Sequence, residues 1–362
     1  MHKRAAPLGT ARSLFGGYMK KLFSVLLALA ICLTGCSSIG RSRYRAQFLT
    51  LFDTVTEIVG YSQSKALFTE QVAQIHDELQ QYHMLFDIYH EYEGVVNLKT
   101  LNAQAGNAPV AVDKKIIDLL LFSKQMHTQT GGSVNIAFGS VLKLWKQYRE
   151  QGIEDPENAQ LPPLAALLEA ARHTNIDDII IDEQNSTVFF KDPALQLDVG
   201  AIAKGYSVEA VCKSAQARGV DHMLVSVGGN VRAIGKKSLS EPFVVSVKNP
   251  DAQLQSTGYV SVGLSEQALV TSGDYLRYYT VDEKQYHHII DPETLMPAGH
   301  YRSVSILCPD SGIADALSTA AFLLEFEQSL ALVQQFPDAE AFWIFPDGTT
   351  KATKGFEKHV SK

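Results

Sequence analysis

An apolar run near the N-terminus decides where the folded part of this chain can begin. The run covers 12 residues, from Leu22 to Leu33, and follows the basic residues Lys20 and Lys21. A helix that spans a bilayer needs about 20 apolar residues, so this run is too short to cross a membrane and instead has the length of a signal-peptide core. We therefore expect the chain to be exported and to fold from the residues that follow.

A short motif at the end of this run predicts a lipid anchor. Leu33-Thr34-Gly35-Cys36 resembles the bacterial lipobox, whose cysteine carries a diacyl lipid and becomes the mature N-terminus. We expect a lipoprotein signal peptide over 1–36, with Met19 as its functional start, and a polar tether over 37–47. Lipid on Cys36 would anchor an extracytoplasmic protein to the cell membrane. An uncleaved anchor and an ordinary secretory signal are the alternatives.

Composition places the remaining chain among globular proteins. The whole chain of 362 residues is 46% hydrophobic and 20% charged, which allows one large domain or two packed lobes with a substantial core. The net charge is −7 and no block of like charges occurs, which argues against a nucleic-acid partner. Cys212 and Cys308 lie in apolar stretches, so buried free thiols are at least as consistent with the sequence as a disulfide.

Helical and strand patterns alternate along the chain. Apolar residues three and four apart predict an amphipathic helix from Phe68 to Phe86. We expect further helices over 114–130, 139–148, 164–173 and 313–335 and after Lys204, and strands over 48–61, 178–182, 187–191, 195–199, 223–227 and 243–247, with a hairpin around Pro346-Asp347-Gly348. This mixture predicts an α+β fold of antiparallel sheets backed by helices.

A glycine-rich turn is the first candidate for chemistry. The predicted strand 195–199 delivers Asp198 into Gly200-Ala201-Ile202-Ala203-Lys204-Gly205, where a helix begins. Backbone N–H groups and the positive end of the helix dipole suit a phosphate there, and Lys204 adds a full charge. The turn lacks the Lys-Ser/Thr of a Walker A loop. A structural turn with a surface lysine is the alternative.

Two further groups carry polar side chains at suggestive spacings. Asp315 and Thr319 lie four apart in a helical segment, which places two hard oxygen ligands of the kind magnesium prefers on one face. His287 and His288 are adjacent on a strand, so only one of them can face a given site, where a neutral imidazole would serve as a general base. Structural alternatives exist for both groups. Asp315 could simply favour a helix N-terminus while Thr319 packs its methyl group, and the histidines could lie at an exposed strand end. No third ligand at zinc spacing accompanies the histidines.

The order of the motifs is far more specific than any one of them. Leu-Asp-Val-Gly-x-Ile-Ala-Lys-Gly-Tyr at 197–206 precedes Val-Ser-Val-Gly-Gly-Asn-Val-Arg at 225–232, Thr-Ser-Gly-Asp-Tyr at 271–275, Tyr-His-His-Ile-Ile-Asp-Pro at 286–292 and Ala-Asp-Ala-Leu-Ser-Thr-Ala at 314–320. This series closely resembles the ApbE family of FAD:protein FMN transferases. The resemblance implies an ApbE-like, T-fold-related single catalytic unit of two packed lobes over 48–355.

Roles for individual residues follow from this resemblance. Asp315, Thr319 and the backbone oxygen of Ala201 match the family's magnesium ligands. His288, the histidine of the His-Ile-Ile-Asp-Pro motif, matches the residue assigned to catalysis. The FAD-contacting positions of the family correspond to Tyr89, Asp198, Lys204 and Ile289.

The sequence departs from the family pattern in two flavin-contacting segments. Phe52-Asp53-Thr54 stands in place of Met-Gly-Thr, which makes the contact at Phe52 aromatic. Ser133, Val134 and Asn135 follow Gly132 where the family has Gly-x-Phe-Asp, and Asn135 keeps hydrogen-bonding capacity without the charge. We expect Phe52, Val134 and Asn135, which are substituted, and Ser133, which is at the variable position, to contact FAD.

The resemblance therefore implies a magnesium-dependent enzyme with FAD as its substrate. It would transfer the FMN moiety to a threonine or serine hydroxyl of an acceptor flavoprotein, either a membrane redox subunit or an extracellular flavoprotein, and release AMP. Hydrolysis of FAD to FMN and AMP at the same site is one alternative. A non-catalytic flavin-binding lipoprotein is another.

Overall fold

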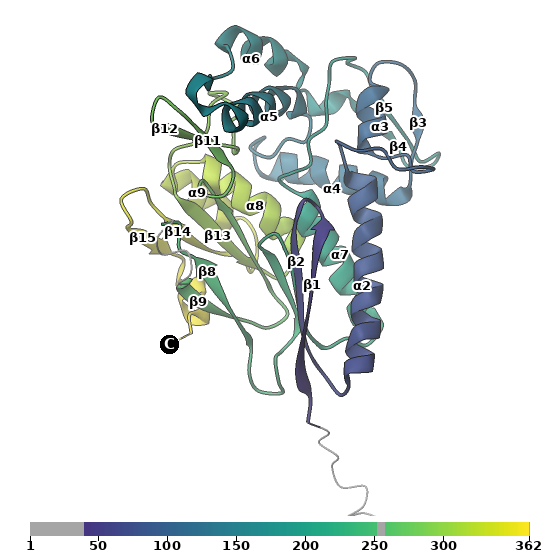
Figure 1. Cartoon of the computed structure of the whole chain (residues 1–362), viewed down its shortest axis with the longest axis vertical. Helices are drawn as coiled ribbons and strands as arrows, with labels where there is room; N and C mark the ends of the chain where they lie inside the picture. The colour runs from purple at the N-terminus through teal and green to yellow at the C-terminus, as the bar shows by residue number, and fades with distance from the viewer. Residues whose placement is uncertain (1–39, 252–257, 362) are drawn as a thin grey trace, which may run out of the picture. The chain divides into compact units, whose positions relative to one another are not determined.

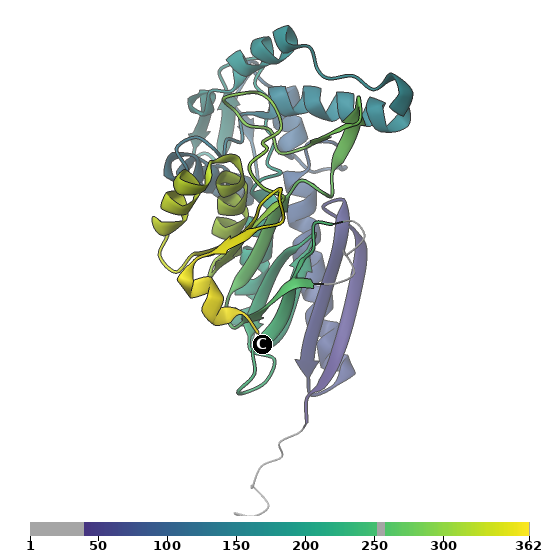
Figure 2. The same ribbon diagram turned by 90° about the vertical axis from the view of Figure 1, so that its left-hand side faces the viewer.

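One eight-stranded sheet organises the chain in the strand order β1-β2-β6-β7-β10-β13-β14-β15 (Figure 1). The computed structural model describes residues 40–251 and 258–361, so the predicted signal peptide, Cys36 and the start of the tether lie outside the described residues. The strands are β1 (Ser42–Leu51), β2 (Thr54–Ser62), β6 (His222–Val227), β7 (Asn230–Gly235), β10 (Ala268–Gly273), β13 (Ser303–Cys308), β14 (Glu340–Ile344) and β15 (Thr350–Ala352). Figure 2 shows the β1–β2 hairpin, in purple, at the sheet edge away from the yellow C-terminal elements.

Helices cover one face of this sheet. They are α2 (Lys65–Phe86), α7 (Ala203–Ala217), α8 (Ser311–Leu323) and α9 (Phe326–Gln334). Ser64 caps α2 by accepting a hydrogen bond from Leu67 N–H, and the apolar stripe from Phe68 to Leu79 packs into a core shared with α7 and β6. The predicted helix over 68–86 is therefore confirmed. Cys212 and Cys308 are buried free thiols.

A two-stranded ribbon and the C-terminal helix cover the other face. They are β8 (Phe243–Lys248), β9 (Gly258–Leu264) and α10 (Lys354–His359). Phe243 packs into the same apolar cluster as Phe342 of β14 and Phe356 of α10, whose rings stack with centroids 5.4 Å apart. The central strands of the sheet, from β7 to β14, are thus covered on both faces.

The remaining elements stand at one end of the sheet. They are α3 (Leu98–Ala103), α4 (Lys114–Gln129), α5 (Gly139–Glu154), α6 (Leu164–Ala170), the sheet β3-β5-β4 (Val110–Ala111, Thr187–Phe190, Ile179–Asp182), the ribbon β11 (Tyr278–Val281) with β12 (Lys284–His287), and the 3-10 turns Pro156–Asn158, Ala171–His173 and Ile176–Asp178. Trp145 of α5 is buried, and its Nε1–H donates to Leu295 O (2.9 Å). The predicted α+β class, with antiparallel sheets backed by helices, is confirmed. In the described part of the chain, no helix combines the length and apolarity that a membrane crossing requires.

Two predicted strands were wrong in ways that affect the site. The strand expected over 48–61 is a hairpin, because Phe52 and Asp53 both adopt left-handed backbone (φ 53° and 50°) and reverse the chain. The segment 195–199 forms no strand of a sheet, and its one pairing is an isolated bridge between Gln196 and Phe138. Its Leu197 instead pairs with the side-chain amide of Asn102, which accepts from Leu197 N–H (2.6 Å) and donates to Leu197 O (3.1 Å).

The helix expected over 313–335 was wrong in its continuity. Leu324 and Glu325 adopt extended backbone and separate α8 from α9. Ser329 of α9 then lies close enough to donate its hydroxyl to Ala321 O (2.8 Å). The break folds α9 back against α8 and leaves the N-terminal turns of α8 free to face α7.

Candidate active site

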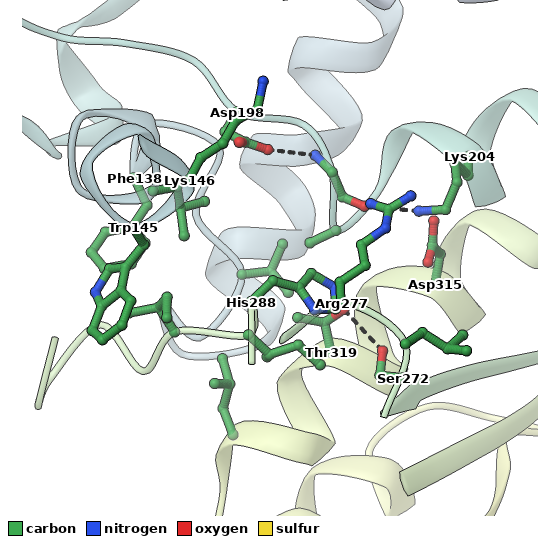
Figure 3. Close-up of a pocket in the computed structure, with 18 of the residues that line it drawn as sticks. Phe138, Trp145, Lys146, Asp198, Lys204, Ser272, Arg277, His288, Asp315 and Thr319 are labelled. Atoms are coloured by element: carbon green, nitrogen blue, oxygen red, sulfur yellow. Dashed lines mark hydrogen bonds between the residues drawn. The ribbon is translucent and has the colours of Figure 1, made fainter. Parts of the chain in front are cut away.

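A cavity of about 430 Å³ lies where the ends of the sheet strands meet α5, α7 and α8 (Figure 3). This volume falls within the usual range for a small-molecule site. Eleven of the predicted site residues line the cavity: Tyr89, Ser133, Val134, Asn135, Asp198, Ala201, Lys204, His288, Ile289, Asp315 and Thr319. Segments separated by more than 200 positions in the sequence are therefore brought to one place.

Phe52 is the one predicted site residue of the described chain that does not line this cavity. Its turn neighbours Asp53 and Thr54 do line the wall. The Phe52 ring packs against His83 with centroids 5.5 Å apart, and Phe52 N–H donates to His83 Nδ1 (3.2 Å). The turn therefore reaches the cavity through Asp53 and Thr54.

The glycine-rich turn is held in place by its own side chains. Asp198 N–H donates to Ile136 O (2.9 Å), and Asp198 Oδ1 accepts from Gly200 N–H (2.8 Å). Burial raises the pKa of Asp198 in spite of this bond. Lys204 Nζ donates to Gly200 O (3.0 Å), which bends the lysine back over the turn at the cavity wall.

Several oxygen atoms that could bind a metal lie where α7 meets α8. In a regular helix Gly205 N–H would donate to the carbonyl of Ala201, four residues earlier. Here Gly205 N–H donates to Asp315 Oδ2 (2.8 Å), so no group in the described chain donates to Ala201 O. Asp315 thus accepts the Gly205 N–H that would otherwise bond to Ala201 O. The carbonyl of Ala201, a residue that lines the cavity, is left without a hydrogen bond from the described residues.

Thr319 extends this set along α8. Its hydroxyl lies one helical turn after Asp315 and 3.3 Å from Ser272 Oγ, which in turn contacts Ser318 Oγ (2.8 Å). Carboxylate, hydroxyl and free carbonyl oxygens are the hard donors that magnesium takes, usually together with water and substrate phosphate. No group of three or more histidine, cysteine or acidic side chains that could hold a metal occurs in the described ranges. The donors present therefore fit magnesium shared with a phosphate ligand.

Gly205 should be required for this junction. A Cβ at Gly205 would stand 2.3 Å from Ser311 O and 2.4 Å from Asp315 Cβ, too close for either atom. We expect Gly205→Ala to destabilise the fold by about 1–3 kcal/mol through overpacking and to displace the Asp315 carboxylate. Thermal unfolding should show a lowered midpoint. Gly299→Ala is the matched control, since no atom lies within 4 Å of a Cβ there, and an equal shift in both variants would contradict the prediction.

The two adjacent histidines face different surroundings, as strand alternation predicts. His287 is buried, and its Nε2–H donates to Ala298 O (2.6 Å) while its ring packs against Phe322. His288 lines the cavity, and its buried Nδ1 has no hydrogen-bond partner in the described chain. Burial, followed by the charges of Arg277 and Arg149, lowers the pKa of His288 to about 3. His288 is therefore a neutral imidazole with an unused ring nitrogen.

Several functional residues were missed from the sequence. Lys146 and Arg149 of α5 and Arg277, which follows the Thr-Ser-Gly-Asp-Tyr motif, line the cavity. Lys146 Nζ lies 3.5 Å above the centre of the Tyr89 ring, a cation–π contact. A helical-wheel reading of α5 would have placed Lys146 and Arg149, three apart, on one face beside the buried Trp145. No local signal singles out Arg277.

The substituted segment at 133–135 is tied down by its polar groups. Asn135 Oδ1 accepts from Ala137 N–H (2.9 Å), and its Nδ2 donates to Thr174 O (2.8 Å). His127 Nδ1 lies 3.0 Å from Val134 O. These bonds fix the loop at the cavity wall, so Asn135 holds its own chain in place as well as facing the cavity.

Comparison with known proteins identifies the family. The ApbE family model matches residues 52–343, and the chain belongs to this family. It is 32% identical over 358 residues to the FAD:protein FMN transferase of Treponema pallidum, covering 93% of this chain and 94% of the relative. It is 30% identical over 268 residues to a Klebsiella pneumoniae FAD:protein FMN transferase, covering 72% of this chain and 80% of the relative. The crystal structure of an ApbE protein from Thermotoga maritima superposes with a TM-score of 0.77 at 28% identity, covering 89% of this chain and all of that one.

Proposed function

We propose that this protein is a magnesium-dependent enzyme that transfers the FMN moiety of FAD to a threonine or serine hydroxyl of an acceptor protein and releases AMP. The observation that carries the proposal is that oxygen donors, cationic side chains and a neutral histidine line the same cavity. The names of the similar proteins, FAD:protein FMN transferases, support the same activity.

The residues at the α7–α8 junction would hold the metal. Asp315, Thr319 and the Ala201 carbonyl would ligate it, and a bound magnesium ion would neutralise the charge of the FAD diphosphate and of the departing AMP. Lys204 and the Gly200–Gly205 turn would position the diphosphate beside these ligands. Because Gly205 N–H is already bonded to Asp315, the turn would act mainly through Lys204 and its remaining N–H groups.

His288 would move the proton. The acceptor hydroxyl donates its proton to the neutral His288 ring as its oxygen forms a bond to the FMN phosphorus. The bond between that phosphorus and the bridging oxygen breaks, and AMP leaves with the electron pair. General-base catalysis of this kind contributes about 10²–10⁴-fold to the rate.

Incubation with FAD, magnesium and an acceptor protein tests the proposal. Flavin fluorescence that stays with the denatured acceptor band in a gel is the expected result. Fluorescence found only in free FMN would identify a hydrolase, and FAD retained unchanged would identify a binding protein. Either outcome would overturn the proposal.

The lowered pKa of His288 has a consequence for pH dependence. A general base must be unprotonated, and a pKa of about 3 keeps His288 unprotonated where an ordinary histidine, with a pKa of about 6.5, would take up a proton. We therefore expect kcat/KM, which reports groups of the free enzyme, to show no histidine-like acid limb between about pH 5 and pH 8. A fall of tenfold per pH unit below about pH 6.5, with the protein still folded by circular dichroism, would contradict this expectation.

We also propose that Cys36 carries a lipid that anchors the enzyme outside the cytoplasm, near acceptors such as membrane redox subunits or extracellular flavoproteins. The motif Leu33-Thr34-Gly35-Cys36 supports this location. Cys36→Ser should move the protein from the membrane fraction and abolish its labelling by radioactive palmitate. Unchanged labelling would rule out Cys36 as the lipid site. Cys308→Ser is the matched control, because that thiol is buried.

A further inference from the structure

Two arginines in the cavity wall lack a counter-ion. Arg149 comes from α5, and Arg277 comes from the loop between β10 and β11. Within residues 40–251 and 258–361, neither guanidinium has a carboxylate within 4.0 Å or any hydrogen bond. Most charged side chains of the cavity are engaged: Lys204 bonds Gly200 O, and Lys146 covers Tyr89.

The two arginines also lie close enough to act on one another and on His288. Burial, and after it the charge of Arg277, lowers the pKa of Arg149. Arg277 and Arg149 are the charges that most disfavour the cationic form of His288, ahead of Lys204. Lys204, by contrast, is the charge that acts most strongly on Asp315. Lys204 and Asp315 are one group of cavity residues, and Arg149 and Arg277 with His288 are the second. Figure 3 draws Arg277 beside His288.

Like charges gathered without a counter-ion predict an anionic ligand. Arginine presents a planar fork of donors that matches the oxygens of a phosphate, and a pair of such forks can bind one phosphoryl group from two sides. Lysine cannot reproduce this geometry. The second group thus has the composition of a phosphate subsite.

We infer that Arg149 and Arg277 bind the phosphoryl group that is transferred, the FMN phosphate of FAD, and that Arg277 stabilises its charge during the reaction. The inference rests on the proposed function, in which the acceptor hydroxyl attacks the FMN phosphorus while losing its proton to His288. The phosphorus must then lie beside His288, and in the described cavity wall the two guanidiniums are the cations that no other group engages, since Lys204 bonds Gly200 O and Lys146 covers Tyr89. The AMP phosphate would then bind at the other group, Lys204 and Asp315.

Binding of the two halves of FAD separates these assignments without requiring activity. The probes are FMN, riboflavin and AMP, each titrated against the purified full chain in detergent and against Arg277→Met and Arg149→Met. Losing a charge-assisted hydrogen bond should raise the Kd of FMN about 10- to 100-fold. The Kd of riboflavin, which has no phosphate, and that of AMP should change less than about twofold. Lys143→Met, a loss of charge on an exposed residue of α5 outside the cavity, is the control and should change none of the three.

Rates of transfer supply the second test. Arg277→Met should lower kcat about 10²–10³-fold, as removal of a preorganised donor to a reacting oxygen does. The combined loss in Arg149→Met/Arg277→Met should be smaller than the product of the two single losses, because both side chains serve one phosphoryl group. Arg277→Lys should recover only part of the rate, since a lysine keeps the charge without the fork.

The possible failures are distinguishable. Weakened AMP binding with unchanged FMN binding, or equal weakening of FMN and riboflavin, would overturn the inference. So would wild-type kcat in Arg277→Met. Arg277→Met could weaken FMN binding as expected while the wild-type protein never labels an acceptor. That pair of results would support the phosphate subsite and contradict the proposed function.

Discussion

Replacing Asp315 by alanine is expected to lower FMN transfer by at least about 10³-fold and to remove its response to magnesium. Metal ions supply several kcal/mol of transition-state stabilisation in such reactions, and each 1.36 kcal/mol is a factor of ten in rate. Asp315 is the one carboxylate in the proposed ligand set, so its loss leaves that set without a charged ligand. A magnesium titration of the initial rate measures the effect.

The control for this variant lies on the same helix. Asp310 caps α8 by accepting from Gly312 N–H and Ile313 N–H, and it does not line the cavity. Asp310→Asn removes one negative charge while keeping a good capping residue, so its magnesium dependence should match that of the wild type. If Asp315→Ala and the wild type were half-saturated at the same magnesium concentration, the metal assignment would fail.

His288→Ala should reduce transfer about 10²–10⁴-fold while FAD binds nearly as before. The imidazole would touch the attacking hydroxyl rather than hold the substrate, so its loss should appear in kcat. Transfer assays quenched at set times give kcat, and quenching of flavin fluorescence gives the affinity for FAD. Normal flavin labelling of the acceptor by His288→Ala would exclude this residue as the base.

His287 provides the neighbouring comparison. Its ring bonds Ala298 O and packs against Phe322, so it belongs to the core. His287→Ala should lower the midpoint of thermal unfolding, whereas His288→Ala should not, because His288 Nδ1 has no partner to lose. Opposite stability effects would mean that the roles of the two histidines are exchanged.

Much of the architecture was predictable because its signals are local. The helix at 68–86 follows from apolar spacing alone, and the α+β class follows from the alternation of the two periods. The ordered motifs also named most of the residues that line the cavity. The proposed metal ligands were the easiest part to predict, because Asp315 and Thr319 lie on one helix face whatever the tertiary structure.

The parts that could not be predicted depend on long-range contacts. Segment 195–199 has strand composition, but the Asn102 side chain takes the place of a neighbouring strand, and no periodic pattern encodes that substitution. The reversal at Phe52 and Asp53 begins with a phenylalanine in left-handed backbone, where turns of this kind favour glycine, asparagine or aspartate, so the turn signal was weak. Arg277 enters the cavity because the chain turns there, and its importance becomes visible only beside Arg149 and His288.

The close approach of two helices at Gly205 has a consequence for how this enzyme tolerates change. The bond from Gly205 N–H to Asp315 means that the distance between the axes of α7 and α8 also sets the spacing of the proposed magnesium ligands. A substitution at the buried interface of α7 and α8, well away from any substrate, would alter that distance while the protein stays folded. Affinity for the ion should therefore serve as a sensitive gauge of helix packing and decline in weakened variants before the fold itself is lost.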